Sequence, residues 1–186
     1  MEKRMTWALM AGVLLAFAMA ARADQTAFSK DLFLSRVTVD VDRNKKTKIE
    51  GGDFDDKKDR ISFKAKFRNS DPNRAFNGLK YELFIFGQSM TDQKAFKLLQ
   101  RTSEPFSLAP LQEFVFESPE VVTAWDNTGA IFGEKYKGWY LRVFSPTGEL
   151  ILVKSVISIF SKTEGLDALQ VGQAYDKNMK PVPLTR

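Results

Sequence analysis

The chain has 186 residues, of which 28 are Lys or Arg and 23 are Asp or Glu, so its formal net charge is +5. It contains no cysteine and no histidine, which excludes disulfide bonds, Cys–His and Ser–His nucleophilic pairs, and metal or haem sites built on those ligands. The charges are mild and interspersed, whereas nucleic-acid-binding proteins usually present a strongly basic face, so we expect no nucleic-acid partner and no cofactor.

The first 23 residues have the pattern of a secretory signal peptide. A basic start at residues 1–4 precedes an apolar run over residues 5–20, and Ala21-Arg22-Ala23 forms a small-residue cleavage site before Asp24. The apolar run is shorter than the roughly 20 residues that a membrane-spanning helix needs; an uncleaved anchor is the alternative. The pattern predicts cleavage between Ala23 and Asp24. The exported chain would have a net charge of +3, no lipid-attachment cysteine and no transmembrane segment.

Three segments in the first half alternate between apolar and polar residues, as half-buried strands do. They are predicted at residues 33–41, 61–68 and 79–87, the last being apolar on both faces at its far end. The polar stretch 42–60 is expected to be a connection that contains Gly51 and Gly52. Residues 69–73 are turn formers and end the second strand.

The second half predicts further strands and a different C-terminal part. Residues 96–103 fit an edge strand, with a helical turn over 91–99 as the alternative. Pro110 lacks a backbone donor and predicts an edge or a break within 106–117, before a strand centred on residues 114–116. Residues 136–145 and 149–160 flank a turn with Pro146 and Gly148, which predicts a hairpin. One short helix is predicted within residues 162–171, followed by a flexible tail over 173–186.

About seven short strands separated by turns predict an all-β fold. The favoured architecture is an antiparallel immunoglobulin-like β-sandwich over residues 24–172, without a disulfide. A closed barrel is the alternative.

Several segments resemble a known family. ISFKAKFRNSD at 61–71, GLKYELFIFG at 78–87, GWYLRVF at 138–144 and PTGE at 146–149 are similar to segments of exported immunoglobulin-like domains of Gram-negative bacteria of the Verrucomicrobia type. The resemblance covers about residues 33–161. It implies the same sandwich fold, a place in the periplasm or at the outer cell surface, and the link that some such domains have to type IV pilus-like assemblies. It carries over no catalytic residue.

Two aromatic residues are candidates for binding. Trp125 lies in a loop-like context, and Tyr136 opens a later strand; such side chains stack on sugars or contact partner proteins. Trp139 and Tyr140 fit core positions instead.

Carboxylates offer two weaker candidates. Asp53, Asp55 and Asp59 lie in an acidic segment that would suit calcium, but its spacing is not that of an EF-hand and two lysines interrupt it, which favours a solvated loop and no metal. Acids for hydrolysis are available, although their spacing selects no pair. They are Glu82, Glu113, Glu117, Glu120 and Glu149.

Sheet edges are the remaining candidate. An open edge would accept a strand from a partner or from a second copy, giving homo-oligomers, whereas lysines at 45, 46, 48, 64 and 66 would protect it. The favoured hypothesis is a non-catalytic exported module that binds another envelope or pilus-like protein. The alternatives are a carbohydrate-binding β-sandwich at the cell surface and a carboxylate-dependent hydrolase.

Overall fold

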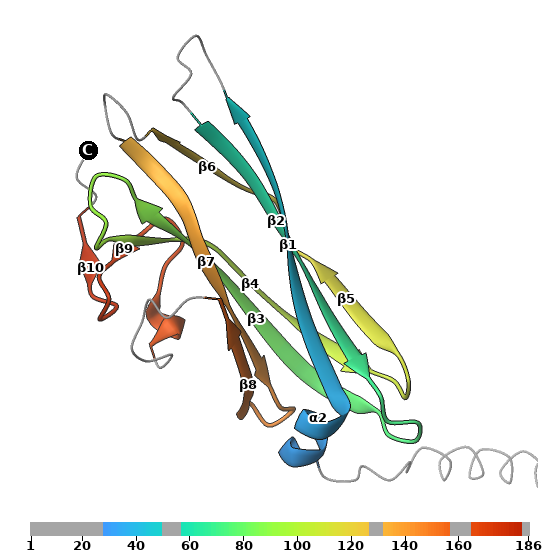
Figure 1. Ribbon diagram of the computed structural model, residues 1–186. Coiled ribbons are helices and arrows are strands. Elements are labelled where there is room, and N and C mark those ends of the chain that lie inside the picture. The colour runs from blue at the N-terminus through green and yellow to red at the C-terminus, as the bar shows by residue number, and fades with distance from the viewer. Residues whose placement is uncertain (1–27, 50–56, 127–131, 157–164, 184–186) are drawn as a thin grey trace, which may run out of the picture.

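In the computed structural model the chain forms two layers of antiparallel strands (Figure 1). The structure describes residues 28–49, 57–126, 132–156 and 165–183. The predicted signal peptide with its cleavage site at Ala23 and Asp24, and two of the acidic-segment candidates, Asp53 and Asp55, lie outside the described residues.

The first layer consists of β1 (Val37–Ile49), β2 (Lys57–Asn69), β5 (Glu113–Glu117) and β6 (Val121–Asp126). The second layer consists of β3 (Phe76–Ser89), β4 (Phe96–Leu108), β7 (Phe132–Phe144), β8 (Leu150–Ser155), β9 (Ala174–Tyr175) and β10 (Pro181–Val182). Helix α2 (Lys30–Arg36) precedes β1, and one 3-10 turn, η1 (Leu166–Ala168), precedes β9.

The strands follow the order β1-β2-β6-β7-β3-β4-β9-β10, with β5 beside β2 and β8 beside β7. Within the described residues β1 and β10 are the two ends of this path and do not pair with each other, so the fold is a sandwich and not a closed barrel. The predicted all-β antiparallel sandwich is confirmed, with ten strands in the described residues where about seven were expected.

The two layers are joined where β6 meets β7. Trp125 lies opposite Gly133 in that short ladder. Gly133 has φ +82°, and a Cβ atom there would lie 2.0 Å from the carbonyl oxygen of Ala124. Only glycine fits, because it combines a positive φ with no side chain at the closest backbone approach.

Apolar side chains from both layers fill the space between them. Ile61, Phe63, Ala65 and Phe67 on β2 are all at most 1% exposed, and Tyr81 on β3 packs against Phe67 with ring centroids 6.0 Å apart. Burial of each large apolar side chain contributes about 1.5–3 kcal/mol relative to exposure. The apolar positions of the alternating pattern are therefore the positions that lie on the inner face of the sandwich.

Two differences from the predicted elements lie near the N-terminus. Residues 33–36 are helical, because the Ser29 hydroxyl accepts a hydrogen bond from the Leu32 N–H at 3.3 Å and caps α2. Residues 42–49 and 57–60 belong to β1 and β2, where a connection was expected. Their side chains are polar because this part of the ladder faces solvent, and every residue from 42 to 49 is exposed.

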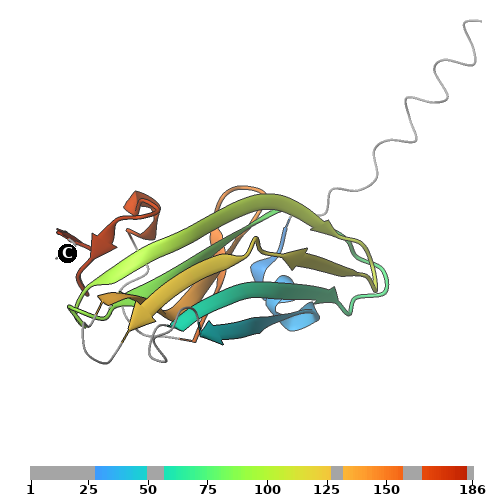
Figure 2. The same cartoon turned by 90° about the horizontal axis from the view of Figure 1, so that it is seen from above.

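The C-terminal part also differs from the prediction. The short helix is reduced to η1. Residues 174 and 175, expected in a flexible tail, form β9, which pairs with Phe96 and Lys97 of β4, and both are buried. β9 extends the second layer beside β4, and η1 lies on the side of β3 and β7 away from β1 and β2 (Figure 1, Figure 2). The C-terminal segment covers the second apolar face of β3, which would otherwise be exposed to solvent.

Other predictions are confirmed. Residues 96–103 form a strand, Pro110 lies in the turn between β4 and β5, and the turn with Pro146 and Gly148 joins β7 to β8.

Candidate interaction surfaces

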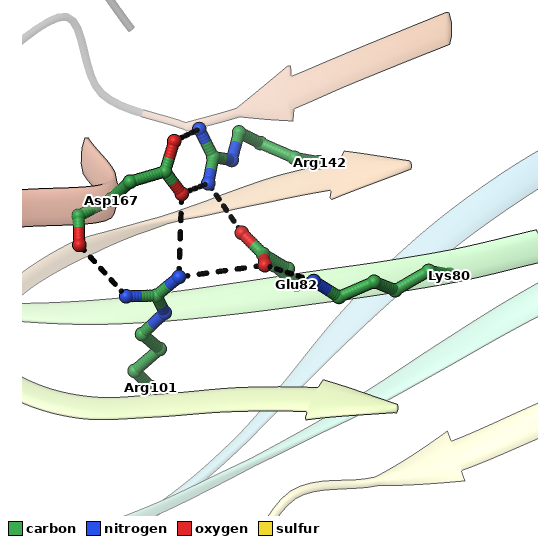
Figure 3. Close-up of polar contacts among 5 residues, drawn as sticks. All are labelled: Lys80, Glu82, Arg101, Arg142 and Asp167. Carbon is green, nitrogen blue, oxygen red and sulfur yellow. Dashed lines mark hydrogen bonds and ion pairs between the residues drawn. The ribbon is translucent and has the colours of Figure 1, made fainter. Parts of the chain in front are cut away.

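A buried ionic cluster lies on the outer face of the second layer, where β3, β4, β7 and η1 meet (Figure 3). The Glu82 side chain is 3% exposed and accepts hydrogen bonds from Arg142, from Lys80 at 2.8 Å and from Arg101 at 3.4 Å. Arg142 also donates to the carboxylate of Asp167, and Arg101 donates to the Asp167 backbone oxygen at 3.1 Å. Three cations thus surround two carboxylates.

The cluster keeps its carboxylates ionised. Burial acts to raise the pKa of Glu82, but the hydrogen bonds and charges of Lys80 and Arg142 outweigh it and hold this pKa below its ordinary value. The hydrogen bonds from Arg142 likewise lower the pKa of Asp167. The Arg142 guanidinium lies 5.0 Å from the Phe84 ring centroid and 5.1 Å from that of Phe144, so aromatic faces add to its stabilisation.

The same cluster fastens the C-terminal segment to the sandwich. Asp167 makes the ionic contact, while Leu166, Leu169 and Tyr175 pack against an apolar patch on the sheet. That patch consists of Phe84, Phe86, Leu98 and Tyr140. Beside the segment an open groove of about 450 Å³ remains. It is lined by Lys80, Glu104, Phe144, Pro146 and Asp167, among others.

The sequence by itself does not pair Glu82 with Arg142. A signal was present, because each is a charged residue flanked by apolar ones, within a stretch of its strand that is buried on both faces. Buried charges at such positions require partners. What the sequence could not show is that β3 and β7 are neighbours in a register that sets Glu82 opposite Arg142.

Trp125 lies at the end of the sandwich where β2, β6 and β7 meet, and Tyr136 lies beside Phe63 nearer the middle of β2; neither is an open stacking surface. Trp125 is 6% exposed, and its indole N–H donates to Asp59 at 3.3 Å. Tyr136 is half-buried, with its ring 5.8 Å from that of Phe63 and the Arg43 guanidinium 5.1 Å from its centroid. A role for Trp125 and Tyr136 in binding a partner or a glycan stays a prediction.

Asp59 organises the polar contacts at this end. Its fully buried carboxylate accepts from Lys45 at 2.8 Å and from the Thr47 hydroxyl at 2.7 Å, besides Trp125. Burial acts to raise its pKa, but these hydrogen bonds outweigh burial and hold the pKa below its ordinary value. The neighbouring Thr123 hydroxyl is buried and has no partner among the described residues. Asp59 is therefore occupied by protein donors, which leaves it unsuited to the calcium role considered from the sequence.

The free edge of β1 is the second surface. Arg36 O accepts from Ser70 N–H and so points toward β2, whereas Val39 O accepts from the Lys154 ammonium and points away. Because successive residues of a strand direct their backbone groups to opposite sides, the odd-numbered residues from 41 to 49 present N–H and C=O groups to the side away from β2. No strand within the described ranges pairs with that side.

The outer face of the first layer is a set of exposed ion pairs. They join Lys64 to Glu117, Lys66 to Asp42, Arg68 to Glu113 and Arg60 to Glu120 at 2.8–3.2 Å. Pairs of this kind contribute only about 0–1 kcal/mol each. Lys64 and Lys66 lie on β2, which has neighbours on both sides, so they do not protect an edge.

Two absences hold for the described ranges 28–49, 57–126, 132–156 and 165–183. These ranges hold no helix long and apolar enough to cross a membrane. They also hold no cluster of three or more Asp, Glu, His or Cys residues arranged to bind a metal ion.

No protein-family model matches this chain. No curated protein matches it either. Among solved structures it is similar to a crystal structure from Akkermansia muciniphila, with 12% identity over 78% of this chain and 85% of that one, and a TM-score of 0.39. A structural-genomics target shares 14% identity over 73% and 93% of the two chains, with a TM-score of 0.34.

A third similar structure is a β-glucosidase from Kluyveromyces marxianus. It shares 12% identity over 64% of this chain and 14% of that one, with a TM-score of 0.27. At these TM-scores the three likenesses carry no argument about function. The family resemblance drawn from the sequence, with its link to pilus-like assemblies, stays a prediction.

Proposed function

We propose that this protein is a non-catalytic interaction module that accepts a strand of another protein at the free edge of β1. The observation that carries the proposal is the row of backbone N–H and C=O groups that the odd-numbered residues from 41 to 49 direct away from β2. Strand addition to such an edge is a common mode of peptide recognition, in which main-chain hydrogen bonds supply the affinity.

Charge favours an acidic strand of a different protein over a second copy of this chain. Between residues 42 and 49, β1 carries Arg43, Lys45, Lys46 and Lys48 but only one acid, Asp42. Pairing two copies of β1 would place lysines of like charge beside one another, which is unfavourable. An acidic strand would instead gain charge-assisted contacts. The lysines therefore act against self-association at this edge and favour the acidic partner.

The state of the carboxylates supports a binding role over hydrolysis. The acid of a glycoside hydrolase must hold a proton near neutral pH, which requires a raised pKa. Neighbouring cations lower the pKa of Glu82 and of Asp59. The other candidate acids form surface ion pairs, Glu113, Glu117 and Glu120 on the first layer and Glu149 with Lys30 at 3.3 Å.

Export and an envelope partner belong to the same proposal. The leader pattern of residues 1–23 supports export, and the resemblance to exported immunoglobulin-like domains supports a partner in the periplasm or at the outer surface, including a pilus-like assembly. The free edge of β1 would serve either partner.

The test uses Arg43→Pro with Arg43→Ala as the matched control. Both variants remove the side chain, but only proline removes the Arg43 N–H, which points to the free side, so the hydrogen bonds between β1 and β2 are kept. We expect the wild-type protein and Arg43→Ala to retain a partner from envelope extract that Arg43→Pro binds at least tenfold more weakly. Thermal unfolding of the variants checks that all three are folded.

A zero-length carbodiimide cross-linker, which couples amines to carboxylates, should join Lys46 or Lys48 to acidic residues of that partner. Equal capture by Arg43→Pro would refute strand addition at β1. Cross-links between two copies of β1 would identify the occupant as this chain itself and refute the acidic partner.

A further inference from the structure

Two lysines converge on one indole ring at the end of the sandwich where β2, β6 and β7 meet. The ammonium groups of Lys57 and Lys135 lie 4.9 Å and 4.5 Å from the ring centroid of Trp125. They are therefore less than about 10 Å apart, which is within one Debye length at 0.1 M salt, so each raises the electrostatic energy of the other. We call Lys57, Trp125 and Lys135 the tip cluster.

Within the part of the chain that the structure describes, no carboxylate neutralises the positive charge of the tip cluster. Neither lysine forms an ion pair with a carboxylate of the described residues, in contrast to Lys45, whose charge is matched by the buried Asp59. Lys135 is exposed and Lys57 is half-buried, so both ammonium groups can be reached from solvent.

We infer that the tip cluster binds an acidic saccharide through its carboxylate groups. A carboxylate between Lys57 and Lys135 would relieve their mutual repulsion and form charge-assisted hydrogen bonds. Trp125 is buried beneath the two ammonium groups and would hold them in place through its ring, so that the ligand contacts the lysines. This site is separate from the free edge of β1 and does not depend on the proposed strand addition.

The backbone around the tip cluster favours a saccharide over an acidic peptide. Lys57 is paired with Ile49 on one side and with Trp125 on the other, and Trp125 is paired in turn with Gly133. No strand edge is therefore free at the tip cluster within the described ranges. An extended peptide, which binds through main-chain hydrogen bonds, would find no backbone groups to pair with there. Among the described residues, the tip cluster offers two ammonium groups and one aromatic ring.

The experiment measures binding of polygalacturonate, a carboxylated polysaccharide, to the purified protein. Of the three tryptophans at 7, 125 and 139, Trp7 and Trp139 are replaced by Phe, so that Trp125 alone reports on its surroundings by fluorescence. We expect polygalacturonate to change the Trp125 emission in a saturable way that weakens as salt is added, and neutral dextran to leave it unchanged.

Charge-matched variants locate the site. In Lys57→Gln/Lys135→Gln we expect binding at least tenfold weaker, since two charge-assisted contacts are lost. In Lys46→Gln/Lys48→Gln, which removes the same charge from β1, we expect a change of less than about threefold. Equal losses in both double variants would show a general attraction to basic protein and refute the site.

Two further results would overturn the inference. Poly-glutamate binding as tightly as polygalacturonate would identify an acidic peptide as the ligand class. Weaker polygalacturonate binding after neutralising the acids of the preceding segment, Glu50, Asp53, Asp55 and Asp56, would also contradict it, because removing like charge must strengthen binding of an anion.

Discussion

Replacing Arg142 with leucine tests whether the ionic cluster on the outer face of the second layer stabilises the fold as a unit. The change leaves the Glu82 carboxylate, 3% exposed, with only Lys80 and Arg101 as partners, and their side chains are 50% and 29% exposed. Removing one member of a buried ion pair costs about 3–5 kcal/mol. The remaining partners offset part of this. The lost contact to Asp167, whose side chain is 68% exposed, adds about 0.5 kcal/mol.

We therefore expect Arg142→Leu to lower the free energy of unfolding by about 3 kcal/mol, which corresponds to a decrease in Tm of roughly 6–12 °C for a domain of this size. Glu82→Leu should cost about 1–2 kcal/mol, because Arg142 retains Asp167. The double variant should lose much less than the two single variants together, since no buried charge is left unpaired. Urea denaturation of the four proteins measures the coupling energy.

The pH dependence provides an independent readout. In the wild-type protein the pKa of Glu82 is lowered, so its contribution to stability is present above the ordinary value of 4.5 and is lost as the pH falls through the lowered value. In Arg142→Leu fewer cations oppose the effect of burial, so the pKa of Glu82 rises. Protonation of Glu82 then removes the cost of an unpaired buried charge. The stabilities of the two proteins should thus converge as the pH falls through the lowered pKa of Glu82. Additive losses within about 0.5 kcal/mol, or a difference that does not change with pH, would refute this account.

Two other predictions concern the link between the layers and the C-terminal segment. Gly133→Ala should destabilise the protein by more than 2 kcal/mol by thermal unfolding, about twice the cost of Gly148→Ala. Both glycines have positive φ, but only at Gly133 does the new Cβ meet backbone, while nothing lies within 4 Å at Gly148; equal costs would contradict the close approach of β6. Tyr175→Ala should cost about 3 kcal/mol and speed amide hydrogen exchange at Leu98, whose N–H bonds to Gln173 O. Unchanged exchange at Leu98 would show that the segment does not depend on this ring.

Alternation along the chain was sufficient to predict the inner faces of the sandwich. Ile61, Phe63, Ala65 and Phe67 are buried where their period of two places them, and the turns at Pro110 and at Pro146 end strands because proline and its neighbours determine the backbone locally. These predictions succeeded because they depend on residues close in sequence.

The prediction was wrong where distant partners decide the outcome. Residues 42–49 look like a loop, yet they form half of a ladder because β2 supplies their hydrogen bonds. Tyr175 lies in a segment with the composition of a tail, yet it is buried because β3 has a second apolar face to cover.

The sequence by itself determined that the chain is an all-β protein with two buried faces, because side-chain polarity at alternate positions is a local property. Only the tertiary structure decided which strands are neighbours. Strand order set Glu82 against Arg142, placed Lys57 and Lys135 around Trp125, and left β1 with one unpaired side. Register between strands far apart in the chain depends on the sum of many weak contacts, which no single segment encodes.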